Sequence, residues 1–313
     1  MNIYSYIAKR LLYTIPILLG VCLLIFLIFN VVAGDPTPML LGKHATAKQM
    51  AALRHELGLD KSWFIQYVDI LKSAFTLNFG RSWFSKQHIA SMLQTGTVIS
   101  LTLVVPTLFI SHFIAIVLGL LAAYKRGNFV DKAMVVVTVM LMSISALTYI
   151  LFGQWLFAYK LSWFQVAGYT PSFPEVLSYI TLPCLILIIL NIGADMRFYR
   201  TVILDEIYQD YVRTARANGI PEWVILGKHV LKNAMIPIVT NFMFQIPALL
   251  FGTILVESFF GIPGLGGILL QAINNSDFPI IKAMTILSAM FYIVINLITD
   301  ILYTWLDPRI KLS

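Results

Sequence analysis

Long stretches of apolar residues without charged side chains constrain what this sequence can fold into. A helix that crosses the hydrocarbon core of a bilayer needs about 20 apolar residues. None of the stretches alternates with the period of two that a membrane β-barrel requires. We predict six transmembrane helices, in Leu11–Ala33, Ile89–Tyr124 (from about Val98), Ala133–Tyr159, Val176–Ala194, Asn233–Val256 and Ala283–Leu306.

The composition supports this class. Of the 313 residues, 59% are hydrophobic and 12% are charged, and the mean hydropathy is +0.83. A soluble domain is about 45–50% apolar and about 25% charged. Half the usual charge cannot cover a soluble globule of this length, so the sequence predicts an all-α polytopic membrane protein.

A further uncharged stretch, Ser258–Ser276, is ambiguous. It contains several residues that break helices, and we therefore predict a loop or a re-entrant turn rather than a seventh span. These residues are Gly261, Pro263, Gly264, Gly266 and Gly267.

Basic residues beside the spans predict the orientation, because cytoplasmic loops are enriched in Lys and Arg. With the N-terminus inside, the inner segments hold most of the basic residues near span ends, whereas the two short outer loops hold only Lys160 and Lys282. Both termini are therefore predicted to be cytoplasmic. The net charge of +7 is explained by this topology and does not indicate a nucleic-acid surface.

Two polar segments are long enough to have structure of their own. The chain then divides into an N-terminal segment with the first span (residues 1–33), a long outer loop (34–96) and a core of five spans (97–313). In the outer loop, Thr46 and Gln49 predict a capping box that opens a helix ending near Gly58. The aromatic stripe from Trp63 to Phe75 predicts a second helix, either at the membrane interface or docking a partner that delivers substrate.

The inner segment, Met196–Ile236, predicts two short helices joined by a turn. Asp205, Glu206 and Asp210 would begin the first helix, and Arg213 and Arg216 would lie near its end, as the helix dipole favours. Gly219 would stop that helix in a left-handed conformation. Pro221 would begin the second helix, which leads through Lys232 into the fifth span.

The chain shows no sign of its own energy source. Neither Gly42-Lys43 nor Gly227-Lys228 has the spacing of a phosphate-binding loop. No metal-ligand spacing and no nucleophile–base arrangement is visible, so no catalytic residue and no metal site are predicted.

Polar residues within or beside the spans could line a passage or bond helix to helix. Asp195, Glu257 and Asp300 are predicted near span ends rather than at the midplane, which disfavours an ion-coupled carrier. The candidates for a translocation pathway are Ser143, Ser145, Asn191, Asn241, Gln245 and Glu257.

Several segments resemble a known family in chain order. The inner stretch Asp210–Gly219 with His229–Pro237 resembles the cytoplasmic signature of permeases of ABC importers, in the dipeptide/oligopeptide/nickel variant. Further matching segments are Arg10–Leu12, Gly34–Pro36, Leu57–Asp60, Phe79–Ser82, Val256–Gly266 and Leu306–Arg309. The long first outer loop resembles that of the first, B-type permease subunit. Arg213 and Thr214 replace the first two residues of the broader Glu-Ala-Ala signature.

The resemblance implies the type I ABC importer permease fold in a bacterial cytoplasmic (inner) membrane. It implies an ATP-driven importer of di- and oligopeptides, in which this chain forms the translocation pathway as a heterodimer with a second, related permease. The further partners would be two ATPase subunits that bind ATP and Mg, and an extracytoplasmic solute-binding protein. This chain would hold no cofactor. The elbow at residues 205–232, within the coupling region 196–236, would dock an ATPase through Asp210, Tyr211, Arg213, Thr214, Ala215, Arg216 and Gly219.

Two alternatives stay open at this point. The same architecture could import nickel or another small solute instead of peptides, because the binding protein carries most of the specificity. A stand-alone channel or ion-coupled carrier is the alternative from a different class.

Overall fold

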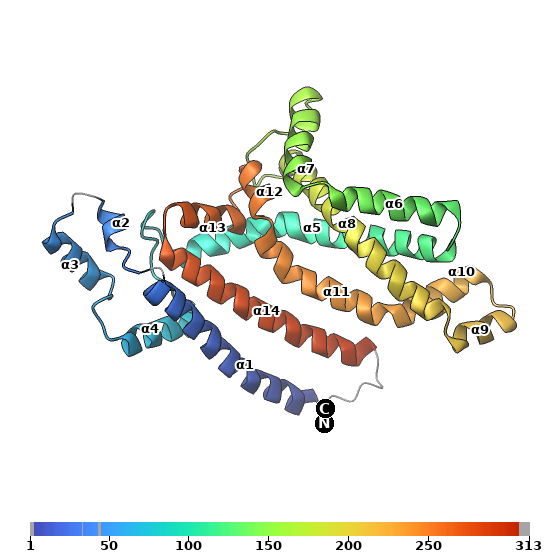
Figure 1. Cartoon of the computed structure of the whole chain (residues 1–313), viewed down its shortest axis with the longest axis horizontal. Helices are drawn as coiled ribbons and strands as arrows, with labels where there is room; N and C mark the ends of the chain where they lie inside the picture. Colours follow the sequence, from blue (N-terminus) through green and yellow to red (C-terminus); the bar gives the residue numbers. More distant parts are fainter. Residues whose placement is uncertain (1–2, 33, 43–44, 307–313) are drawn as a thin grey trace. The chain divides into compact units, whose positions relative to one another are not determined.

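The computed structural model describes residues 3–32, 34–42 and 45–306, and these are almost entirely helical (Figure 1). The sole strand-like feature in the described part is an isolated bridge between Arg81 and His88. The chain forms two compact units: Met1–Thr97 with Gly267–Leu297, and Val98–Gly266 with Ile298–Lys311. Helices α5 (Ile89–Tyr124) and α14 (Phe278–Leu306) belong partly to each unit.

The first unit contains the N-terminal span and the predicted outer loop. Helix α1 (Ile3–Leu27) continues as a π-helical turn, η1 (Ile28–Val32), and is followed by α2 (Thr37–Leu41), α3 (Ala47–Glu56) and α4 (Trp63–Thr76). The predicted capping box is confirmed, since Thr46 and Gln49 bond reciprocally at the start of α3. Gly58, at φ +66°, follows the end of that helix.

Helix α4 is the predicted aromatic helix, and it packs along α1. The Tyr67 hydroxyl donates to the Leu19 carbonyl at 3.0 Å, and the rings of Phe26 and Trp63 meet edge to face at 6.3 Å. Ala74 is fully buried in the core of this unit. Phe64, on another side of α4, is 75% exposed.

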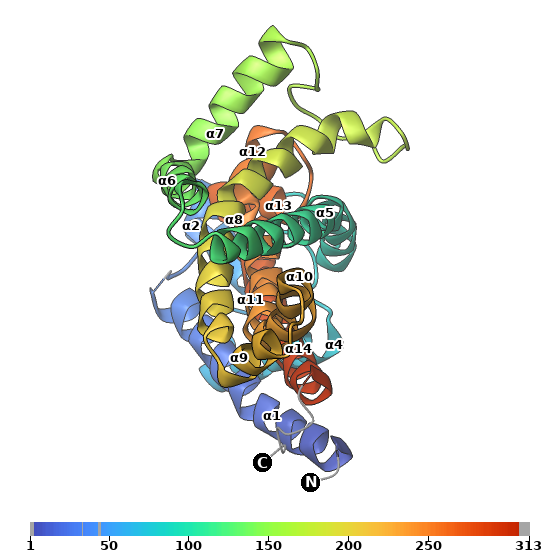
Figure 2. The same ribbon diagram turned by 90° about the vertical axis from the view of Figure 1, so that its right-hand side faces the viewer.

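The second unit is a bundle of longer helices. It contains α6 (Phe129–Ser143), α7 (Ala146–Gly153) with the π-helical η2 (Gln154–Lys160), and α8 (Val176–Ile207). The chain then forms α9 (Asp210–Ala217), α10 (Glu222–Val224), the π-helical η3 (Ile225–Val230), α11 (Leu231–Gly252) and α12 (Ile254–Phe259). Figure 2 faces the end of this unit at which α9 and α10 lie.

The predicted span Ala133–Tyr159 is not one straight helix. Helices α6 and α7–η2 meet at 87°. The cause is local, because Ile144 and Ser145 both have extended backbone and interrupt the helical hydrogen bonds. Figure 1 shows this bend, and the pair is either a broken span or a re-entrant segment.

Four described helices are long and apolar enough to cross a membrane: Leu12–Val31, Ile89–Tyr124, Val176–Ile207 and Phe278–Tyr303. The bent pair raises the number to five if it counts as one span. The remaining predicted span, Asn233–Val256, corresponds to α11, which is not in this set. Six spans and cytoplasmic termini therefore stay predictions.

Two boundaries differ from those expected. Helix α8 does not end near Ala194 but continues to Ile207, so part of the predicted inner loop is helix. Ser258–Ser276 is not a loop throughout, because α13 (Leu265–Asn274) forms within it. Gly266 and Gly267 lie in the first turn of α13.

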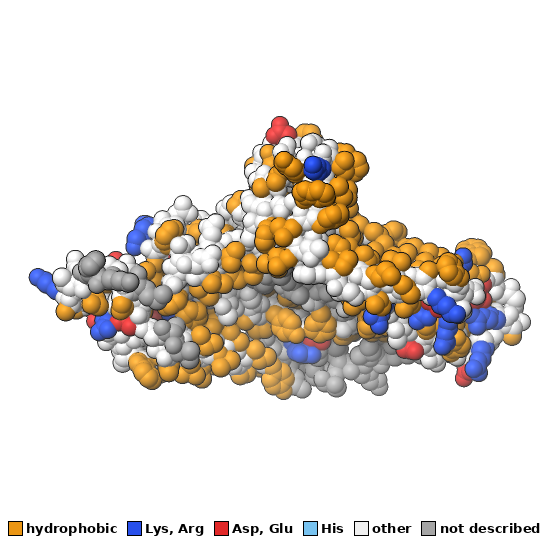
Figure 3. Space-filling model, turned by 45° about the horizontal axis from the view of Figure 1, so that its top comes forward, with side chains coloured by type: hydrophobic (Ala, Val, Ile, Leu, Met, Phe, Trp, Pro, Cys, Tyr) orange, Lys and Arg blue, Asp and Glu red, His pale blue; other side chains and the backbone are white. Residues whose placement is uncertain are grey.

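Exposed apolar side chains cover much of the face shown in Figure 3. Among the exposed apolar side chains of α5 are Val98, Phe109 and Phe113, which are 60–70% exposed. A soluble surface rarely shows contiguous apolar patches of this kind, whereas a lipid-facing surface requires them.

Candidate functional site

The polar elbow between α8 and α11 is built around a tight helix stop. Gly219 has φ +74°, a conformation that favours glycine. Its N–H donates to the Arg216 carbonyl at 3.0 Å, and the Ile220 N–H donates to the Ala215 carbonyl at 3.2 Å. This pair of bonds is the Schellman motif. The predicted left-handed stop at Gly219 is confirmed.

The start of the elbow differs from the prediction. Asp205 and Glu206 do not begin the first elbow helix but lie in the last turn of α8, where the helix dipole disfavours acidic side chains. Helix α9 begins at Asp210. The Tyr211 hydroxyl donates to Glu206 at 2.6 Å and stabilises that carboxylate. Burial raises the pKa of Tyr211 to about 12, and the hydrogen bond to Glu206 is the second cause of this rise.

An ion pair closes the elbow from within. The Arg216 guanidinium donates to both oxygens of Glu222, at 2.6 and 3.1 Å. Two parallel charge-assisted bonds fix the angle between α9 and α10. Hydrogen bonding to Arg216 holds the pKa of Glu222 below its usual range. The resemblance placed Arg216 among the residues that dock an ATPase subunit, whereas in the structure Arg216 pairs with Glu222 of the same chain.

The predicted docking residues lie on two sides of α9. Ala215 is buried in the chain's own core beside Val212, and Tyr211 is half-buried. Asp210, Arg213 and Thr214 are exposed, as are Arg216 and Gly219 at the turn. Arg213 and Asp210 form an exposed pair at 3.3 Å. The small side chain at Ala215 therefore permits close packing inside the chain, and Asp210, Arg213 and Thr214 present the open face.

The pathway candidates are not gathered at one place. Ser143 ends α6 and donates to its own helix at Val139, whereas Ser145 is exposed at the bend. Asn191 donates to the Leu187 carbonyl of its own helix at 2.8 Å.

The structure does bring Asn241 and Gln245 together. Their side-chain amides on α11 both donate to the Asp195 carboxylate of α8, at 2.9 and 2.5 Å. Asn241 also lines an open groove of about 380 Å³. The other residues of this groove are Phe198, Ile236, Pro237, Thr240, Phe244 and Tyr303.

Asp195 has partners that sequence reasoning did not identify. It was predicted near the end of a span; α8 continues for another twelve residues beyond it, and Asn241 lies at the middle of α11. Its depth in the membrane stays a prediction. Both Asp195 and the neighbouring His112 of α5 are 3% exposed. The signal available in the sequence was polarity alone, since the partners are 46 and 50 residues away.

Glu257 is buried at a different place in the same unit. Its carboxylate accepts from Ser100 of α5 at 2.7 Å and from Thr253 at 2.8 Å. The Ser100 hydroxyl also accepts the Leu265 N–H at 2.8 Å. A Cβ at Gly264 would lie 2.5 Å from the Ser100 Oγ and 2.6 Å from the Glu257 carboxyl carbon. Glycine there allows the chain to close over the carboxylate.

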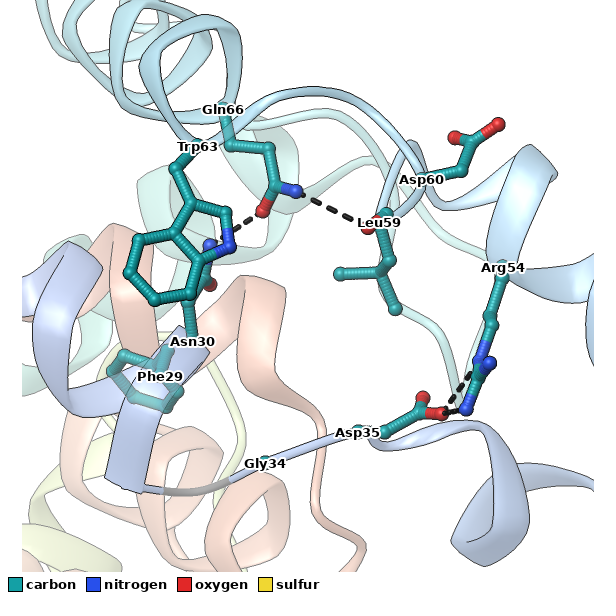
Figure 4. A pocket seen from close by; sticks show the side chains of 9 residues that line it. All are labelled: Phe29, Asn30, Gly34, Asp35, Arg54, Leu59, Asp60, Trp63 and Gln66. Atoms are coloured by element: carbon teal, nitrogen blue, oxygen red, sulfur yellow. Dashed lines mark hydrogen bonds and ion pairs between the residues drawn. The ribbon is translucent and has the colours of Figure 1, made fainter.

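The predicted outer loop encloses a pocket of about 320 Å³ (Figure 4). Arg54 pairs with Asp35 at its edge, and Gln66 bonds Asn30 and the Leu59 carbonyl. Burial alone would raise the pKa of Asp35, but the hydrogen bonds from Thr37 and from Arg54 outweigh it and lower that pKa. The Asp60 carboxylate points away from the pocket, and it bonds His55 at 2.7 Å. The charges at this pocket are largely paired within the loop.

Long apolar helices and a polar elbow that connects two of them define an integral membrane protein of the all-helical, multispan class. Comparison with family models then gives the family. Residues 115–312 match the binding-protein-dependent transport system inner membrane component. Residues 3–113 match the N-terminal model of the same kind of membrane component. The chain belongs to this family of ABC-transporter permeases.

Relatives match along nearly their whole length. The glutathione transport system permease protein GsiC of Salmonella choleraesuis is 33% identical over 308 residues, which is 98% of this chain and 99% of the relative. The "Probable peptide ABC transporter permease protein y4tP" of Sinorhizobium fredii is 33% identical over 311 residues, with the same coverage.

Family membership confirms several expectations from the sequence. The chain is an inner-membrane, multispan component of a binding-protein-dependent transport system and not its ATPase. Such a system works with a solute-binding protein and ATP-hydrolysing subunits, which are separate chains. Within the family, the stand-alone carrier or channel is no longer an alternative.

Proposed function

We propose that this chain is one of the two permease subunits of an ATP-driven peptide importer. The observation that carries the proposal is similarity over 98% of the chain to permeases named for peptide and for glutathione transport. Glutathione is itself a tripeptide. The second, related permease would complete the pathway, with six spans in this chain and both termini in the cytoplasm.

The open face of the elbow is the proposed contact with an ATPase subunit. Asp210, Arg213 and Thr214 are exposed there, while Val212 and Ala215 anchor α9 in the chain's own core. A surface helix fixed in this way transmits a push to the helices beneath it. ATP-driven closure of the ATPases would displace the elbow and move the spans between inward-open and outward-open states.

For the pathway we propose the surface at Asn241. Its groove is open and mainly apolar, and Asn241 lines it beside the aromatic side chains of Phe198 and Phe244. The remaining candidates, Ser143, Ser145 and Asn191, bond their own helices or lie at the bend, and Glu257 is enclosed. These residues are weaker candidates for contact with substrate.

The test is purification of the whole complex in mild detergent, identification of its subunits, and reconstitution into liposomes with the binding protein. We expect uptake of labelled trialanine that requires ATP hydrolysis and the binding protein. ATP-driven uptake of Ni²⁺ without peptide uptake would contradict the substrate. Transport by this chain alone without ATP would contradict the mechanism.

A further inference from the structure

Two helices lead away from the elbow and pack against each other. Helix α8 enters it at Ile207, and α11 leaves it through α10 and η3. We call the segment from Asp195 to Gln245 the lever. Its two arms share a continuous core. Helix α8 contributes Met196, Tyr199, Ile203 and Ile207, and the elbow and α11 contribute Val212, Ala215, Ile225, Val230, Ala234 and Ile238. Helix α5 packs on the same core through the small residues Ala115, Ala122 and Ala123.

Polar contacts fasten the lever at both ends. At the elbow, the Arg216–Glu222 pair and the bonds around Gly219 fix α9 to α10. At the far end, about 18 Å along α8, Asp195 accepts from both Asn241 and Gln245 of α11. These contacts hold α8 and α11 together at both ends of the lever.

The far end also carries buried polar atoms without hydrogen-bond partners. These are the Asp195 Oδ2, the Gln245 Oε1 and the His112 Nε2. His112 comes from α5, and its ring lies against Phe242 of α11 at 4.9 Å and Tyr199 of α8 at 5.9 Å. Buried polar atoms are normally satisfied, so three open ones in one cluster need an explanation.

The distances around His112 indicate a hydrogen bond to Asp195 that is not formed in this arrangement. The His112 Nδ1 donates to the Leu108 carbonyl of its own helix at 2.9 Å, and it lies 4.0 Å from the Asp195 Oδ2. A shift of about 1 Å between α8 and α5 would bring Asp195 Oδ2 to hydrogen-bond distance of the His112 Nδ1, whose N–H would then donate to Asp195 instead of to Leu108. The cluster thus has one arrangement in which only the Asp195 Oδ1 is bonded, within the lever, and a second one available in which the Asp195 Oδ2 accepts from α5.

We propose that Asp195 is a positioning residue for coupling. It holds α8 against α11 at the far end of the lever, and it forms a hydrogen bond with His112 when the lever moves. The inference rests on the proposed function. Discrete alternative contacts of this kind are what allow a displacement at one site to bias a distant one.

The test uses the complete reconstituted complex with its binding protein and trialanine as the probe. Asp195→Asn keeps the shape and one acceptor but removes the charge. We expect uptake to fall about tenfold, while the ATPase rate stimulated by loaded binding protein stays near that of the wild type. The elbow remains docked in this variant, but its displacement no longer reaches the membrane helices.

Asp131→Asn is the matched control. Asp131 is also buried on the same unit and also pairs with α8, through two bonds to Arg200 at 2.7 and 2.8 Å, but it fastens α8 to α6 instead of α11. We expect uptake and ATPase activity to fall together in this variant, in step with the yield of folded complex.

His112 provides the second arm of the test. His112→Gln keeps a side-chain donor and should retain more uptake than His112→Leu, which keeps none. A parallel loss of uptake and ATPase activity in Asp195→Asn would overturn the positioning role of Asp195, and equal uptake in the two His112 variants would overturn the hydrogen bond with His112. Absence of ATP-driven uptake in the wild type would instead refute the proposed function.

Discussion

Substitution of Gly219 perturbs the elbow through backbone conformation alone. A Cβ at this position would meet no atom within 4 Å, so no steric clash contributes. The left-handed conformation at φ +74° costs a residue with a Cβ about 1–2 kcal/mol relative to glycine. Gly219→Ala should therefore raise the open fraction of the elbow by a factor of about 5–30.

A short series grades the effect. Asn tolerates left-handed backbone better than Ala, so Gly219→Asn should open the elbow less. Gly219→Pro forces φ to about −65° and removes the N–H that donates to Arg216, a loss of about 3 kcal/mol or more. Gly227→Ala is the matched control, because Gly227 also has open space around its Cβ position but no positive φ.

Hydrogen exchange of the peptides covering residues 208–222 measures the opening directly, and coupled uptake measures its consequence. We expect protection and uptake to fall in the order Asn, Ala and Pro at position 219, with Gly227→Ala close to the wild type. Wild-type protection in Gly219→Ala, or equal losses in the Gly219 and Gly227 variants, would refute the reasoning.

Three further predictions concern charge and packing. Gly264→Ala forces a Cβ against the Glu257 carboxyl, so it should lower the free energy of unfolding by about 1–3 kcal/mol and with it the melting temperature. An unchanged melting curve would contradict the close approach. Arg213→Glu removes an exposed ion pair worth about 0–1 kcal/mol, so the melting temperature should stay close to that of the wild type. Co-purification of the ATPase subunit should be lost. A variant that still co-purifies with the ATPase would show that Arg213 is not part of the contact. The pKa of Glu222 is lowered by Arg216, so its contribution to elbow stability is complete above the ordinary value of 4.5 and is lost as the pH falls through the lower folded value. Exchange protection, corrected for the intrinsic rate, should drop in that range and the drop should vanish in Glu222→Gln.

Features with short-range causes could be predicted from the sequence. The capping box at Thr46 needs only a partner three residues away, and the left-handed stop at Gly219 follows from the residue itself. The aromatic helix Trp63–Thr76 is visible in its own periodicity. In each case the information lies within one or two helical turns.

Features that depend on distant partners could not. The charged residues after Ala194 look like the end of a span, but α8 continues because helical hydrogen bonds do not depend on hydropathy. Asp195 is buried because amides 46 and 50 residues away bond it, and Glu257 because Ser100 does. The helix break at Ile144 and Ser145 contains no Gly or Pro, so the sequence gives no signal for it.

The most direct test of coupling through the elbow is site-specific crosslinking in the intact complex. Thr214→Cys places a single reactive group on the exposed face of α9, and the native Cys22 and Cys184 are both buried. Lys48→Cys, at an exposed position of α3 in the predicted outer loop, is the control. With a cysteine-reactive photocrosslinker, we expect Thr214→Cys to capture an ATPase subunit and Lys48→Cys to capture none. Capture of the ATPase from Lys48→Cys, or its absence from Thr214→Cys in a complex that still transports, would contradict the account.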